Sequence, residues 1–79
     1  MGVYEIVEQW VNEIGSQYFR HAVVIHIDGE NIYIITDKPG LMIGYHGALV
    51  NKYREILKDN GYTQQIEFVD TFVGYVKEI

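Results

Sequence analysis

The stretch from Asn31 to Ile56, NIYIITDKPGLMIGYHGALVNKYREI, decides how we read this chain. Its first residues alternate and are rich in isoleucine, which predicts a half-buried β-strand. The segment Asp37–Gly40 breaks the alternation around the only proline, a residue tolerated in the first turn of a helix. We therefore expect a short helix at Leu41–Ile43 and, after the Gly44–Gly47 interruption, a longer helix from Ala48 to about Asn60.

Amphipathic patterns flank this stretch on both sides. Apolar residues at helical spacing predict a helix over Val3–Ile14, ended by Gly15. His21–Asp28 alternates and is rich in β-branched residues, so we expect a strand that ends in a tight hairpin turn at Asp28–Gly29. Downstream, the alternation over about Gln64–Thr71 predicts the last strand.

The order of these elements predicts the architecture. Two helices between the second and the last strand make a crossover long enough for parallel pairing. The order helix–strand–strand–helix–helix–strand thus predicts an α+β two-layer domain, in which a three-stranded mixed sheet carries the helices on one face.

Length and composition agree with one small domain. The 79 residues have room for one core, and 48% apolar and 14% aromatic residues suffice to build it. We assign residues 1–79 to a single domain in which 72–79 form a C-terminal extension. This extension is too apolar for a free tail, so we expect it to extend the sheet or fold back over it. The outer sheet face, expected to hold Val24, Tyr33, Ile35 and Val69, is either covered by this tail or serves as a dimer or partner surface, and we favour the tail.

Several classes of function are disfavoured by composition. With no cysteine, the chain has no disulfide, thiolate metal site or thiol nucleophile. The three histidines have no metal-ligand spacing, and no residues form a recognisable catalytic constellation. We expect neither an enzyme nor a cofactor or metal site. Short apolar runs and the lack of a signal peptide predict a cytoplasmic protein without a membrane segment.

One motif has a direct physical mechanism. Gly44 and Gly47 lie three residues apart between two helices, where glycine permits a tight turn and a close approach of the backbone to a ligand. The free N–H groups and the positive dipole end of the following helix face the same place. This arrangement favours phosphate binding even without a basic side chain.

The strand, the Pro39-Gly40 turn, the aliphatic residues before G-x-x-G and the following helix together resemble a type II KH domain, similar to that of the bacterial small-subunit ribosomal protein at the mRNA entry site. The resemblance covers nearly the whole chain except 72–79. It implies binding of single-stranded RNA or DNA, with the loop against the sugar-phosphate backbone. Because a single unit of this kind has a small interface, we expect low affinity. The residues that it implies as contacts are Gly44, Tyr45, His46 and Gly47 in the loop, Ile43, Val50 and Ile66 under the bases, and Lys38, Lys52 and Arg54 as flanking charges.

The chain departs from that family in its loop and its charge. The two middle loop positions usually include a lysine or arginine, but here they are Tyr45 and His46. Tyrosine can stack on a base, and a histidine gains charge near or below about pH 6.5. The net charge is −5, but residues 37–58 carry four basic and two acidic side chains, a local balance of +2 against −7 elsewhere.

A second reading has the KH-like frame without nucleic-acid binding. The acidic total and the lack of a basic loop residue favour a protein-interaction module, for example a small inhibitor or accessory factor of a larger nucleic-acid enzyme. Its contact surface would hold Tyr45, Leu49 and Ile56, because an exposed apolar patch beside a functional loop marks a partner site. The alternative for Leu49 is packing against the short helix.

Overall fold

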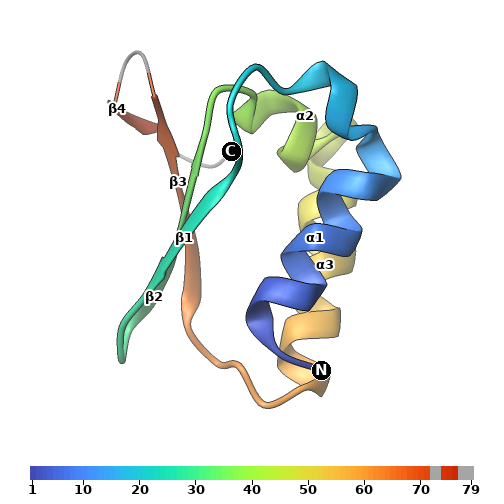
Figure 1. Cartoon of the computed structure of the whole chain (residues 1–79). Coiled ribbons are helices and arrows are strands. Elements are labelled where there is room, and N and C mark those ends of the chain that lie inside the picture. Colours follow the sequence, from blue (N-terminus) through green and yellow to red (C-terminus); the bar gives the residue numbers. More distant parts are fainter. Residues whose placement is uncertain (72–73, 77–79) are drawn as a thin grey trace.

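The computed structural model describes residues 1–71 and the backbone of residues 74–76. It is an α+β domain in which helices α1 (Val3–Ile14) and α3 (Ala48–Asp59) lie against one face of a sheet (Figure 1). A short helix, α2 (Pro39–Ile43), and a single 3-10 turn, η2 (Tyr45–Gly47), precede α3. The predicted fold class and element order are confirmed.

The sheet is mixed, as predicted. Strands β1 (Val24–Ile27), β2 (Asn31–Thr36) and β3 (Gln65–Asp70) lie side by side, with β1 antiparallel and β3 parallel to β2. A fourth strand, β4 (Gly74–Val76), pairs antiparallel with β3. The described part of the C-terminal extension therefore lengthens the sheet at its β3 edge. Its covering of the outer face would depend on residues 72–73 and 77–79, which lie outside the described residues.

Strand β1 is shorter than the predicted strand and begins at Val24 rather than at His21. The reason is the carboxylate of Asp37, which accepts the backbone N–H groups of Arg20 at 3.0 Å and His21 at 3.4 Å. Pairing with β2 starts only where Val24 meets Ile35. A 3-10 turn, η1 (Ser16–Tyr18), lies between α1 and this segment.

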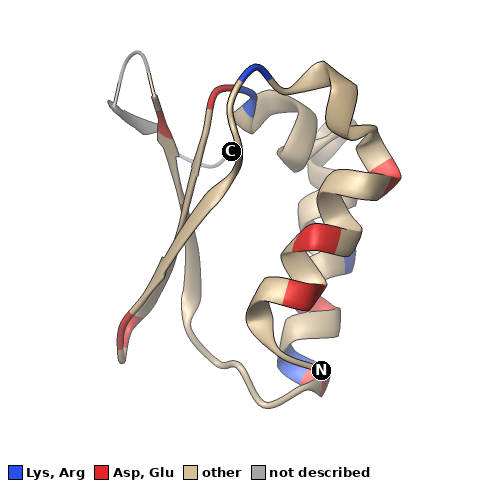
Figure 2. Cartoon of the chain, in the orientation of Figure 1, with Lys and Arg blue, Asp and Glu red and all other residues tan. Residues whose placement is uncertain are grey.

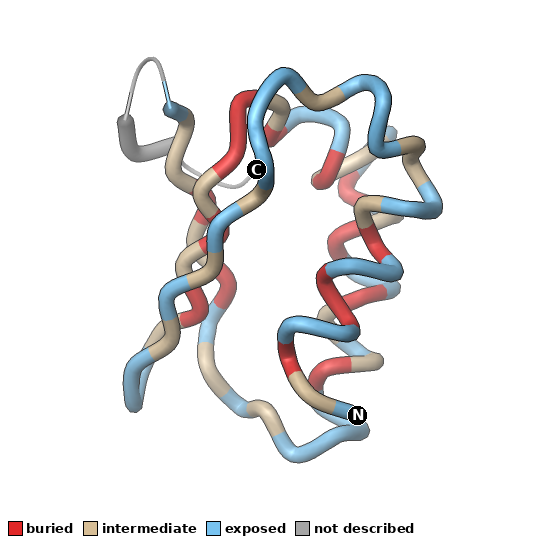
Figure 3. The backbone as a smooth tube through the Cα atoms, in the orientation of Figure 1, coloured by how far each residue is buried: buried red, intermediate tan, exposed pale blue. Residues whose placement is uncertain are grey.

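The core lies between the inner face of the sheet and the apolar faces of the helices, as the buried positions in Figure 3 show. Trp10 is fully buried and meets the ring of Phe68 edge to face, with ring centroids 5.9 Å apart. The predicted stripe of α3 is buried with it. The core residues are Val3, Ile6, Val7, Trp10, Ile32, Ile34, Met42, Val50, Tyr53, Leu57, Ile66 and Phe68. None of the helices in the described ranges has the length and apolarity that crossing a membrane would need.

Candidate functional site

The loop Gly44–Gly47, called the GYHG loop below, turns sharply between α2 and α3. Its backbone has positive φ at Gly44 (78°), His46 (54°) and Gly47 (74°). The N–H of Gly44 closes α2 on the carbonyl of Gly40 at 3.0 Å, and the N–H of Gly47 bonds the carbonyl of Gly44 at 3.1 Å. Such left-handed conformations are costly for residues with a Cβ atom, which explains glycine at two of the three positions.

Gly44 also allows the loop to lie directly on α3. A Cβ atom at this position would come within 2.8 Å of the Cβ of Leu49, closer than side-chain carbons approach one another. Leu49 is half-buried there and packs against the core. This position supports the packing interpretation of Leu49 and reduces its value as a partner contact.

The GYHG loop presents two aromatic side chains to solvent. Tyr45 is 85% exposed, the highest value among the large exposed apolar and aromatic side chains of the described residues. Its ring meets the His46 imidazole at 70°, with centroids 4.1 Å apart.

Gly47 is the N-cap residue of α3, and no side chain of the described residues caps this helix end. The N–H of Ala48 donates to the carbonyl oxygen of Tyr45 in the loop, and the following N–H groups of the first turn are directed the same way.

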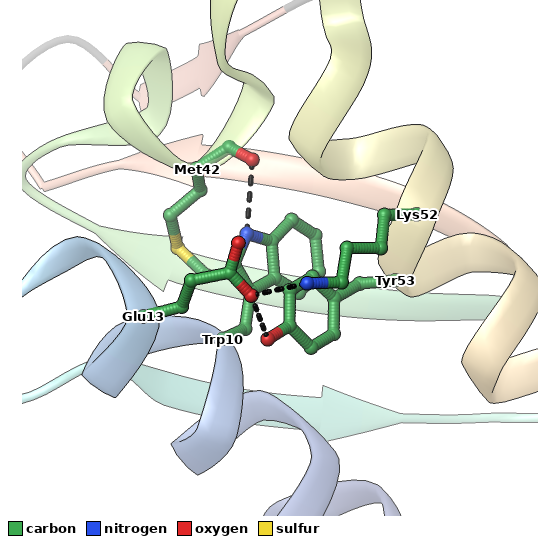
Figure 4. A network of polar contacts seen from close by, with 5 residues as sticks. All are labelled: Trp10, Glu13, Met42, Lys52 and Tyr53. Atoms are coloured by element: carbon green, nitrogen blue, oxygen red, sulfur yellow. Dashed lines mark hydrogen bonds and ion pairs between the residues drawn. The ribbon is translucent and has the colours of Figure 1, made fainter.

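A buried junction holds α2 in place behind this loop (Figure 4). The indole Nε1 of Trp10 donates to the carbonyl oxygen of Met42 at 3.0 Å, and the bond is buried. The indole also stacks on Tyr53 of α3, with centroids 5.0 Å apart and planes 4° from parallel. One side chain of α1 thus fixes both helices that flank the GYHG loop. We call Trp10, Glu13, Met42, Lys52 and Tyr53 the tryptophan junction.

Lys52 belongs to this junction and is directed toward α1. Its Nζ lies 2.6 Å from Oε1 of Glu13, which also accepts the hydroxyl of Tyr53 at 2.7 Å (Figure 4). The hydrogen bond from Lys52, followed by that from Tyr53, lowers the pKa of the Glu13 carboxyl. Burial, followed by the contact with Glu13, raises the pKa of Tyr53 to about 12. The positive charge of Lys52 is therefore paired, which weakens its expected role as a flanking phosphate contact.

The other expected cations differ in position. Lys38 directly precedes α2, and its own N–H donates to Oγ1 of Thr36 at 3.1 Å. Arg54 donates to Oδ1 of Asn51 on the same helix at 2.6 Å. The structure adds Arg20, which the sequence pattern did not indicate, because Asp37 holds its backbone next to Lys38. The contacts of Asp37 with the N–H groups of Arg20 and His21 bring Arg20 near the start of α2. These contacts join residues at least 16 positions apart, so a local sequence pattern does not predict them.

Two of the residues implied as a groove floor lie in the core. Val50 is 1% and Ile66 is 5% exposed, so neither lines an open groove, while Ile43 is half-buried. The expectation that Val50 and Ile66 lie under the bases is therefore wrong. The same apolar spacing is expected for a buried stripe and for the floor of a groove, so the sequence pattern does not distinguish the two.

The structure also changes the set of residues expected on a surface for a protein partner. Ile56 is half-buried and, like Leu49, packs against the core. Tyr45 remains exposed, and it is joined by Leu41 of α2, which is 41% exposed and was not expected there.

Charge is unevenly distributed over the molecule (Figure 2). Acidic positions follow α1 and the β1–β2 turn. The basic positions of the described residues are Arg20 before β1, Lys38 before α2, and Lys52, Arg54 and Lys58 on α3. Among the described residues, no group of three or more histidines and carboxylates is placed to hold a metal ion.

Comparison with known proteins returns no relative for this chain: no family model, no curated protein and no solved structure matches it.

Proposed function

We propose that the chain binds single-stranded RNA or DNA weakly through the GYHG loop. The observation that carries this proposal is the loop itself, a left-handed turn on the N-terminus of α3, which no side chain of the described residues caps, with Tyr45 85% exposed. Backbone N–H groups at a helix N-terminus attract phosphate oxygens. An exposed aromatic ring offers a face on which a base of any sequence can stack. The proposed activity is binding without catalysis, in the cytoplasm.

The charges near the loop support low affinity. Lys52 is paired with Glu13. We therefore propose that Arg20 and Lys38, near the start of α2, are the cations that contact phosphates. Each phosphate contact on a single strand contributes a salt slope of about −0.7 in log K against log salt concentration. We expect a total slope of about −1 to −2 and a Kd weaker than about 1 µM.

The test is a titration of fluorescently labelled single-stranded RNA and DNA at low salt, followed by anisotropy. The variant carries Tyr45→Asp and His46→Asp, which remove the stacking face and add negative charge beside the proposed phosphate contacts. Its matched control is Tyr4→Asp, because Tyr4 is a 63% exposed tyrosine on the first turn of α1, at the other end of the molecule (Figure 1).

We expect wild type and the Tyr4 variant to bind alike, and the double variant to bind at least about tenfold more weakly. Absence of binding by wild type at millimolar protein, or equal losses in both variants, would contradict the proposal.

A second candidate is a protein-interaction module. The observation that favours it is the exposed pair Leu41 and Tyr45, at 41% and 85%, in a chain with net charge −5. Exposed apolar side chains beside a turn are typical of partner sites. Affinity capture from a lysate, with Leu41→Glu as the variant and Tyr4→Asp as the control, tests it. A partner lost only with Leu41→Glu would support this function, and an identical set of captured proteins would count against it.

A further inference from the structure

The outer face of the sheet carries ordered rows of side chains, and no helix of residues 1–71 lies over them. The helices lie on the opposite face (Figure 1). In the strand register, Val24 of β1 pairs with Ile35 of β2, which pairs with Val69 of β3. One step along the strands, His26 pairs with Tyr33, which pairs with Glu67. Across β1, β2 and β3, an apolar row thus lies beside a row with an imidazole on β1 and a carboxylate on β3, and β4 continues the sheet beyond β3.

These positions are partly accessible rather than core positions. Val24 is 53% exposed, and His26 is exposed beside it, whereas the corresponding β2 and β3 positions are half-buried. The His26 and Tyr33 rings lie 5.9 Å apart, so the polar row begins with two neighbouring aromatic rings. The inner face differs sharply, because Ile32, Ile34 and Phe68 are completely buried.

The rows match themselves under a two-fold rotation. An axis lying above the outer face and nearly parallel to β2 places β1 of one copy over β3 of the other. Val24 then faces Val69 of the second copy, and His26 faces Glu67 of the second copy. Tyr33 and Ile35, on the central strand, each meet their own counterpart. The two contacts between β1 and β3 each occur twice, whereas the two contacts on the axis each occur once, as a two-fold interface requires.

We propose that this face packs against the same face of a second copy of the chain, forming a dimer across a two-fold axis along β2. Apolar rows meet apolar rows, and an imidazole N–H meets a carboxylate on each side of the axis. The imidazole donor on β1 and the carboxylate acceptor on β3 fix the strand alignment and select the identical chain as partner, because each copy carries both groups.

The test measures association of the full chain by sedimentation velocity from about 1 µM to 1 mM, with circular dichroism as the check on folding. Val24→Glu places a carboxylate in the apolar row at an exposed edge-strand position, so it should abolish the dimer and leave the fold intact. His26→Glu sets like charges opposite each other twice and should weaken the dimer by about fivefold or more. Combining His26→Glu with Glu67→Lys reverses both pairs and should restore it.

Salt separates this interface from binding through the GYHG loop. Two chains of charge −5 repel each other, so added salt should strengthen the dimer, whereas it weakens nucleic-acid binding. A wild-type chain that stays monomeric at 1 mM overturns the proposal. A dimer that survives Val24→Glu also overturns it, because its interface then lies elsewhere, for example at the β1 edge. Failure of the charge reversal to restore the dimer overturns the proposed alignment.

Discussion

The tryptophan junction includes Met42, which lies two residues before the GYHG loop, yet the two regions differ sharply in burial. Met42 is completely buried, and its carbonyl accepts a hydrogen bond from the buried indole of Trp10. Three residues later, Tyr45 is 85% exposed. A rigid anchor behind an open turn is the arrangement that a binding loop needs, because binding groups on a fixed support lose less entropy on contact. Because Met42 is buried and Tyr45 is exposed, the stability that the junction provides and the binding that the loop provides can be tested with separate variants.

The largest effect is expected from the anchor. Trp10→Ala removes the stacking on Tyr53, the contact with Phe68 and the donor to Met42, and should lower the free energy of unfolding by about 3–5 kcal/mol. Urea titration followed by far-UV circular dichroism measures it. Trp10→Phe keeps a ring and should fold with a smaller loss, which provides a readout if the alanine variant is unfolded. A loss below about 1 kcal/mol for both would show that the junction does not anchor the helices.

The next largest effect on stability is expected at Gly44, where the GYHG loop packs against α3. Gly44→Ala places a Cβ atom 2.8 Å from the Cβ of Leu49 at a φ of 78°, and should destabilise the fold by about 1–3 kcal/mol. Gly40→Ala is the matched control, because it lies within α2, where an added Cβ atom would meet nothing within 4 Å. We expect this control to be neutral or stabilising, since alanine favours helix over glycine. Equal urea midpoints for the two variants would contradict the close packing of the loop on α3.

A smaller, pH-dependent effect comes from Glu13. Its pKa is lowered in the folded chain, so its contribution to stability is present above the ordinary value of 4.5 and is lost as pH falls through the lowered value. Glu13→Gln should therefore be less stable than wild type at pH 7, and the difference should shrink in strong acid. Urea midpoints at several pH values measure it. Glu8→Gln on the same helix controls for the loss of one negative charge, and the same pH trend in both variants would contradict a specific role.

The smallest effect on stability is expected at the tip of the loop. Tyr45→Ala removes a ring that is 85% exposed and should change the free energy of unfolding by no more than about 0.5 kcal/mol. A decrease in the free energy of unfolding above about 1 kcal/mol, measured in urea, would mean that the Tyr45 ring supports the fold. The loop would then contribute to stability as the tryptophan junction does.

Local periodicity predicted the elements well, since helices and strands are short-range patterns. The first helix, Val3–Ile14, and the strand Asn31–Thr36 have the bounds that their apolar spacing indicates. Proline extends α2 to Pro39, ahead of the predicted start, because its fixed φ suits the first helical position.

Long-range contacts decided what the sequence pattern could not. Lys52 resembles a solvent-facing cation on its helix, but its partner Glu13 is 39 positions away in the chain. Val50 and Ile66 have the apolar spacing of either a groove or a core, and only the packing of the sheet on the helices assigns them to the core. Gly15, Gly44 and Gly47, by contrast, lie at positive φ where the sequence places turns, because this conformation is required locally by the backbone. The hairpin glycine, Gly29, does not have positive φ.

The single tryptophan also gives the molecule an internal optical probe. Its indole N–H is bonded to Met42, two residues before the GYHG loop, and its ring is fully buried. Indole emission moves to longer wavelength when the ring meets water and changes in intensity when its hydrogen bond is altered. A ligand that shifts α2 should thus change the fluorescence of Trp10 without any attached dye, whereas a partner on the outer sheet face should leave it unchanged.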